Sequence, residues 1–373
     1  MREIGKICNF RRILTALAVI LLLSLGAPRA RAQDEIYEKS GAEELYQVLD
    51  DDAKDLLSRA GVEGGMVEQG VSGKGLLEGA GELLRDKLGA PFKALAALIG
   101  ILVLCRLGSC FEDGALGENV QLLGAAACGA VMAGPVLGML NACRTAADSA
   151  SAFMAAAVPV YAGLLAAAGN LAAGSGYSFL AMFAGGAIPV LASGILLPAM
   201  RIYLGLAAAS SLSCAKVEKA AGAVYSLGKW VLVTAVTAFT GVLSVQTAVN
   251  AQVDAAAGKA AKLALATGVP IVGGALGDAV TAIQNSVHIV KSGVGAFGIL
   301  AALCLFAPAM IQCALWCGVC MAGQAAGDIL GVPKASSLLG AFSGAVKMVL
   351  AVMASICAVC VASAAAIVFA GAS

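Results

Sequence analysis

The stretch that decides the fold is VGAFGILAALCLFAPAMIQCALWCGVCMAG, residues 294–323. It contains no Asp, Glu, Lys or Arg, and about 20 apolar residues suffice for a helix to cross the ~30 Å hydrocarbon core of a bilayer. The composition of the whole chain agrees, because 60% of its 373 residues are hydrophobic and only 13% are charged. An ordinary soluble domain carries about 25% charged residues. We therefore expect an integral membrane protein.

Other apolar runs of similar length predict further transmembrane helices. The expected spans are residues 91–107, 119–140, 152–173, 178–200, 230–250, 294–323 and 338–371. The fold class is thus an all-α, polytopic transmembrane helix bundle of about seven to eight spans. The run 178–213 is too long for one straight helix and contains Pro189 and Pro198. It predicts one kinked helix, a helix with a re-entrant piece, or two crossings.

The first 32 residues have the three-part layout of a secretory signal peptide. A basic start is followed by an apolar stretch at 13–25 and by the small-x-small site Ala30-Arg31-Ala32. An uncleaved first transmembrane helix is the alternative, although the apolar stretch is short for a span. Cleavage after Ala32 would place the mature N-terminus outside the cytoplasm.

Residues 33–90 form an acidic, amphipathic and extracytoplasmic segment, with fourteen acidic and six basic side chains. Apolar residues at helical spacing predict one amphipathic helix: Leu45, Val48, Leu49, Ala53, Leu56 and Leu57. A second leucine-rich helix, around residues 76–88, should lead into the membrane. The segment is either a docking surface for a partner or a solvated helical lead-in. Its Asp50-Asp51-Asp52 triplet does not predict a metal site, because adjacent carboxylates on a helix point in different directions.

The basic residues Arg201, Lys216, Lys219 and Lys229 predict that a loop at 201–229 faces the cytoplasm. With an extracytoplasmic N-terminus, an odd number of crossings must precede that loop, whereas the predicted spans give four. Either 178–213 crosses twice or a neighbouring span is re-entrant.

Residues 251–292 are weakly polar and too long for a structureless connection. Two amphipathic segments flank Gly268-Val269-Pro270. They either lie in the plane of the membrane interface or enter the bundle as a broken helix pair.

Catalytic chemistry is not predicted. The single histidine, His288, excludes a multi-histidine metal site, and we find no phosphate-binding loop, nucleophile elbow or H-E-x-x-H motif. We therefore expect no catalytic residue, no metal and no cofactor. The net charge of +1 also gives no reason to expect nucleic-acid binding.

Two CxxC pairs, Cys317/Cys320 and Cys357/Cys360, suggest a redox or metal site. Both pairs lie in apolar helices, where Cys acts as a small hydrophobe, and this favours structural packing. Among ionisable residues near the spans, Asp278 and the Arg144 and Asp148 pair are functional candidates, although loop positions would make them ordinary.

An ordered set of short motifs lies between about residues 240 and 310. The motifs are Gly241-Val242-Leu243-Ser244-Val245-Gln246, Lys259-Ala260-Ala261-Lys262, Val269-Pro270-Ile271-Val272-Gly273, Gly277-Asp278-Ala279, Lys291-Ser292-Gly293-Val294-Gly295 and Ala307-Pro308. Their order and spacing resemble the stage III sporulation protein AE family of endospore-forming bacteria. Departures from the family pattern, such as Gly268-Val269-Pro270 for an Asn-Phe-Ile-Pro-like run, identify a divergent member. Candidate functional residues on these motifs are Gln246, Lys259, Lys262, Pro270, Asp278 and Lys291.

The resemblance implies a non-enzymatic subunit of the channel that joins the mother cell to the engulfed forespore. It further implies placement in the outer forespore membrane, in contact with lipid. Expected partners are other subunits of the channel complex, including ring-forming membrane proteins and an ATPase, with a homo-oligomer as a further option. The alternative from the residues is a secondary transporter or permease, in which the broken segments 178–213 and 251–292 would bind a small solute. A membrane-embedded thiol enzyme that uses the CxxC pairs is a third reading.

Overall fold

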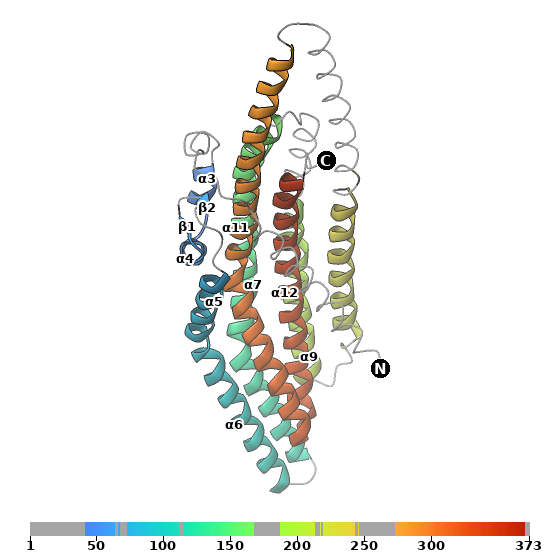
Figure 1. The fold of residues 1–373 in the computed structure, drawn as a ribbon. Coiled ribbons are helices and arrows are strands. Elements are labelled where there is room, and N and C mark those ends of the chain that lie inside the picture. Colours follow the sequence, from blue (N-terminus) through green and yellow to red (C-terminus); the bar gives the residue numbers. More distant parts are fainter. Residues whose placement is uncertain are drawn as a thin grey trace.

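The computed structural model shows a bundle of long helices with a small helical unit packed on one side (Figure 1). The structure describes residues 42–63, 66–67, 73–111, 115–167, 187–212, 217, 219–242, 245 and 273–369. The predicted signal peptide and residues 246–272 lie outside the described residues. Within the described ones, six helices are long and apolar enough to cross a membrane. The predicted polytopic, helical fold class is confirmed, while the predicted number of seven to eight spans is not.

The first two long helices are α6 (Gly89–Phe111) and α7 (Ala115–Ala167). α7 shows that the prediction of separate spans at 119–140 and 152–173 was wrong, because one continuous helix contains the first and residues 152–167 of the second. The residues between them include Arg144 and Asp148. Charged residues interrupt an apolar pattern, but they form helices readily, and no helix-breaking residue lies among them.

The order of the described helices bears on the segment 201–229. Gly108 of α6 lies against Val120 of α7, so the two helices form an antiparallel hairpin. α9 (Leu197–Leu212) then runs back along α7. Among the described residues, α6, α7 and α9 thus make three passes along the bundle before residue 213. Their orientation in the membrane stays a prediction. The expected loop 201–229 is itself mostly helical, because Arg201 lies in α9 and Lys229 in the helix Lys219–Val242.

The run that was expected to be broken by Pro189 and Pro198 is helical from residue 187 to residue 212. It contains one π-helical turn, η1 (Ala192–Leu196), in which the N–H of Leu197 donates to the carbonyl of Ala192. Pro198 has no N–H and its ring would crowd the carbonyl of Gly194 in a regular α-helix. The wider turn next to Pro198 accommodates this, so the described part is one irregular helix.

α11 (Gly273–Leu330) and α12 (Pro333–Phe369) form the central hairpin of the bundle. Gly331 closes it with φ of +68°, a left-handed conformation that favours glycine. The Ser336 hydroxyl donates to the Asp328 carboxylate across this turn. Both helices pack on α7, and their buried residues belong to one continuous apolar core.

The acidic segment folds into a small unit, the N-terminal cap (residues 42–87). It comprises α3 (Ala42–Gln47), α4 (Asp51–Arg59), the paired strands β1 (Val62–Glu63) and β2 (Met66–Val67), and α5 (Gly73–Lys87). The second predicted helix is confirmed as α5. The first was predicted as one helix and is two, because the chain breaks at Asp50, whose ψ of 155° is extended. Acidic residues in the first turn of α4 also interact favourably with its helix dipole.

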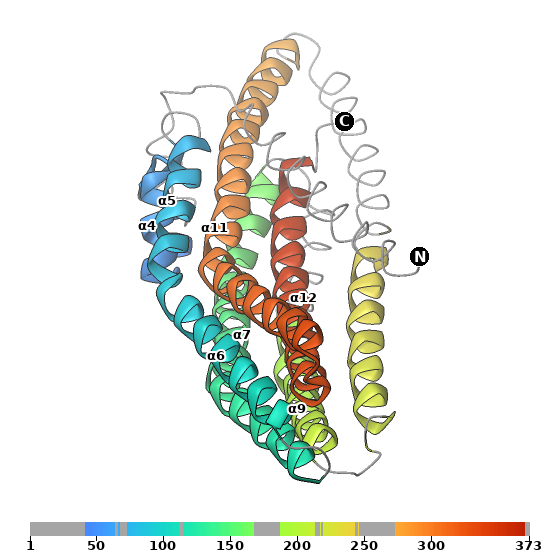
Figure 2. The ribbon, with the colours of Figure 1, turned by 90° about the horizontal axis from the view of Figure 1, so that it is seen from below.

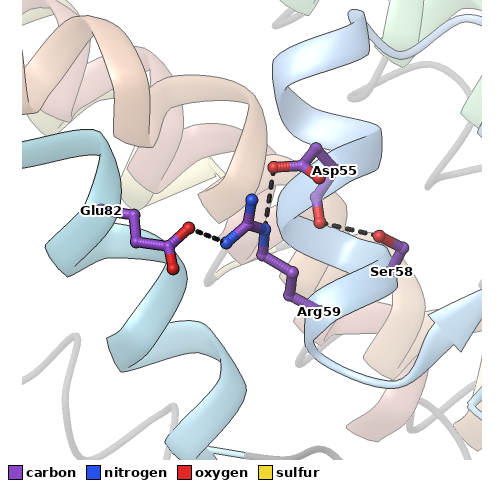
Figure 3. Close-up of polar contacts among 4 residues, drawn as sticks. All are labelled: Asp55, Ser58, Arg59 and Glu82. Carbon is purple, nitrogen blue, oxygen red and sulfur yellow. Dashed lines mark hydrogen bonds and ion pairs between the residues drawn. The ribbon is translucent and has the colours of Figure 1, made fainter. Parts of the chain in front are cut away.

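Figure 3 shows how α4 and α5 of the cap are tied together. Arg59 of α4 forms an ion pair with Asp55 at 2.9 Å and a second one with Glu82 of α5. The hydrogen bond to Glu82 and the charge of Asp55 raise the pKa of Arg59 above its ordinary value. All three side chains are exposed, so these contacts orient α5 on α4 and add little to stability.

Candidate functional site

The structure describes the backbone of two of the six candidate residues from the motifs. Gln246, Lys259, Lys262 and Pro270 are outside the described residues. Asp278 and Lys291 lie in the first half of α11, where the structure describes the backbone as helix. The segment 251–292 thus ends in a regular helix from Gly273 onward, and the contacts of the six side chains remain predictions.

The two CxxC pairs are not brought together. Cys357 of α12 lies at the level of Ala302 of α11, with its Sγ 3.9 Å from that carbonyl oxygen. Cys317 follows Ala302 by fifteen residues on the same helix, which is about 22 Å at 1.5 Å per residue. A site with four thiolates therefore does not form from these pairs. The nine cysteines whose side chains the structure describes are all buried and free of disulfide bonds.

The tightest packing is at one level of α7, α11 and α12. Gly298 of α11 lies so close to Tyr161 of α7 that a Cβ at this position would overlap the tyrosine hydroxyl. Ala364 of α12 reaches the same point, with its Cβ 3.2 Å from that position. Glycine at this crossing leaves room for the Tyr161 side chain and the Ala364 methyl group against the backbone of α11. Close packing at small residues is a main source of helix association in lipid.

The N-terminal cap docks on the bundle as a folded unit and is more than a lead-in. Leu45 of α3 and Leu57 of α4 are fully buried and belong to the same apolar core as α7 and α11. The hydroxyl of Ser149 on α7 donates to the carboxylate of Asp50 at 3.3 Å. In Figures 1 and 2 the cap lies beside α11 and continues through α5 into α6.

Polar residues on several helices lie at the same height along the long axis of the bundle, partway between its two ends. Arg201 of α9 donates from Nη2 to the amide oxygen of Asn141 on α7 at 3.1 Å. On α11 and α12, a Cβ at Gly340 would meet the Gln324 side chain at 3.1 Å. Because these helices are antiparallel, Cys317 and Lys347, each seven residues from that contact, lie at a common level.

Two further contacts fix the helix Lys219–Val242 at this same level. A Cβ at Gly228 would lie 3.2 Å from the Met200 methyl of α9 and 3.8 Å from the Met348 methyl of α12. The rings of Tyr203 and Tyr225 also meet here, 5.3 Å apart.

Four helices thus each carry one exposed cation to this level, and we call the set the charged belt. Its members are Arg144 of α7, Arg201 of α9, Lys229 of the helix Lys219–Val242 and Lys347 of α12. The spacing of these residues in the sequence could not reveal the belt. The belt depends on the axial shift of each antiparallel helix relative to its neighbour.

The described residues provide little for catalysis or for holding a solute. They include no group of three His, Cys, Asp or Glu side chains that could bind a metal ion. One crevice between α7, residues 188–189 and α12 is lined by apolar residues and Cys360, and its cavity volume is only about 10 Å³. Pockets for small molecules usually measure at least about 300 Å³ and present several polar groups.

Comparison with known sequences supports the family resemblance. The family described as stage III sporulation protein AE matches residues 62–371, which include β1 and all six candidate spans. No curated protein and no solved structure matches the chain at a significant level. Since the match covers most of the chain, this multi-pass membrane protein belongs to the stage III sporulation protein AE family.

Proposed function

We propose that this protein is a non-enzymatic membrane subunit of the channel that connects the mother cell with the developing forespore. The observation that carries the proposal is the family match over residues 62–371, which makes the chain a membrane protein of sporulation stage III. The packing of the described residues supports a structural role, because the helices meet through apolar side chains and glycine.

In this proposal the protein lies in the outer forespore membrane with its mature N-terminus outside the mother-cell cytoplasm. The N-terminal cap then faces the space between the two membranes. Its outer surface carries acidic residues such as Glu43 and Asp51, while its apolar residues are used against α7 and α11. The proposed partners are ring-forming membrane proteins and an ATPase that belong to the same complex.

Compartment-specific complementation tests the proposal. In an endospore-forming host that lacks its own family member, the gene is expressed either from a mother-cell promoter or from a forespore promoter. We expect spore formation to return only with mother-cell expression, because only that compartment supplies the outer forespore membrane. Rescue from the forespore alone, or a growth defect in vegetative cells, would contradict the proposal.

A secondary transporter is the competing function. It would need a solute site near broken helices, and the segments on either side of Gly268-Val269-Pro270 could supply one. Purified protein in liposomes separates the two functions. A transporter moves solute down a gradient by itself, whereas a channel subunit is inert without its partners.

A further inference from the structure

The charged belt interrupts helices that are otherwise free of charge over long distances. On α7, neither residues 119–143 nor residues 149–167 contain Asp, Glu, Lys or Arg, and Arg144 and Asp148 lie between them. On α12, no charged residue follows Lys347. The belt therefore divides the bundle into two apolar parts, one on either side of it, which we call tiers.

Only one tier fits into a bilayer. A helix rises about 1.5 Å per residue, so α7, with 53 residues, is about 80 Å long, against ~30 Å for the hydrocarbon core. Placing Lys or Arg at the centre of the core is costly, whereas long cationic side chains near its edge reach the headgroups. Whichever tier is embedded, the belt therefore lies at an edge of the hydrocarbon.

The aromatic residues support the same position. The chain has two tryptophans, and both lie at the level of the belt. Trp230 follows Lys229 and is 66% exposed, whereas Trp316, which precedes Cys317 on α11, is buried in the core, so Trp230 is the tryptophan that can reach the interface. Tyr203 and Tyr225 lie here as well. Tryptophan and tyrosine concentrate at membrane interfaces, where one part of the ring system is apolar and the other is hydrated.

We propose that the charged belt is a lipid-binding surface that takes the phosphate-bearing headgroups of anionic phospholipids in the surrounding bilayer. Four exposed cations on four helices complement a layer of anionic phosphates, and Asp148 is the one acidic residue within four positions of a belt cation. A cation near an anionic membrane surface strengthens binding about fivefold. The belt thus fixes the depth of the bundle in the membrane.

The depth of Trp230 tests the position of the belt. W316F leaves Trp230 as the only tryptophan of the full chain, which is reconstituted in vesicles with nitroxide labels on the lipid headgroup or at acyl carbon 5 or 12. We expect the two shallow labels to quench Trp230 fluorescence at least about twofold more than the label at carbon 12. Strongest quenching from carbon 12, or none from any label, would overturn the proposal.

Energy transfer from Trp230 to dansyl-labelled lipid tests the preference for anionic headgroups. We expect more transfer to dansyl-phosphatidylglycerol than to dansyl-phosphatidylcholine, and inorganic phosphate in the buffer should not compete. The triple variant R144Q/K229Q/K347Q should lose the difference, whereas K219Q, which lies on the same helix as Lys229 but away from the belt, should retain it. Equal energy transfer to both lipids in the unsubstituted protein would overturn the proposal. This result does not depend on whether the triple variant folds.

Discussion

Gly298 of α11 and Tyr161 of α7 occupy adjoining space, with no room between them for a methyl group. Tyr161 is 1% exposed and cannot move aside without disturbing its neighbours on α12. This contact joins the three helices that form most of the core, so it is the point where a small change should have a large effect.

G298A should therefore destabilise the bundle by about 1–3 kcal/mol, the usual cost of overpacking a buried site. Thermal unfolding in detergent, followed by circular dichroism, measures the change. The matched control is G138A on α7, where a Cβ would meet nothing within 4 Å. The control should be neutral or slightly stabilising, because alanine favours a helix by up to about 1 kcal/mol over glycine. Equal melting temperatures for the two variants would show that the crossing is not tight.

The docking of the N-terminal cap depends on its apolar face. L57A should cost about 2–5 kcal/mol locally, because Leu57 is fully buried against the bundle. Limited proteolysis should then cut residues 42–87 faster while the helices of the bundle remain protected. L77A on α5 removes a side chain that is 76% exposed and should leave the cleavage rate unchanged. If L57A is cut no faster than L77A, the cap does not dock as described.

The ion pairs of Arg59 should matter less than this apolar face. R59A removes both contacts with Asp55 and Glu82, but all three groups are exposed, and solvent-exposed ion pairs contribute little to stability. The cap should stay docked in R59A, with proteolysis close to that of the unsubstituted protein. A cleavage rate as high as in L57A would show that these charges hold the cap.

The turn between α11 and α12 should require glycine. Gly331 has φ of +68°, and a residue with a Cβ pays about 1–2 kcal/mol for this conformation. G331A should lower the melting temperature, whereas G205A in α9, where nothing lies within 4 Å, should not. An unchanged melting temperature in G331A would mean that the turn adopts a different conformation.

The CxxC pairs should be dispensable for activity. Replacing Cys317, Cys320, Cys357 and Cys360 by alanine removes small buried side chains, and we expect spore formation to persist with a modest loss of thermal stability. Sporulation efficiency measures the effect. Loss of sporulation with the protein still present in the membrane would support the thiol-enzyme reading instead.

Much of the helical architecture could be predicted from the sequence, because charge-free runs longer than about 20 residues have few alternatives to membrane helices. The apolar residues of the cap were also predictable, since Leu45, Leu49 and Leu57 recur at helical spacing and are all buried. The continuity of α7 could not be predicted, because a drop in hydropathy shows where a helix leaves an apolar environment and does not show where the helix ends. Arg144 marks such a point inside an unbroken helix.

The charged belt could not be predicted for a different reason. Arg201 and Lys347 are far apart in the sequence, and their common level follows from the contacts of Asn141 with Arg201 and of Gly228 with Met200 and Met348. Such contacts depend on the relative shift of neighbouring helices, which short-range patterns do not encode. The same holds for the separation of the two CxxC pairs, which look equivalent in the sequence.

Co-purification from sporulating cells tests the central claim most directly. Protein carrying an affinity tag is isolated from cells at the stage of engulfment after mild crosslinking, and the bound proteins are identified by mass spectrometry. Our account predicts recovery of ring-forming membrane proteins and an ATPase, and their loss when an unrelated multi-pass protein of the same membrane carries the tag. Recovery of this protein alone, combined with solute flux in liposomes, would contradict it and favour a transporter.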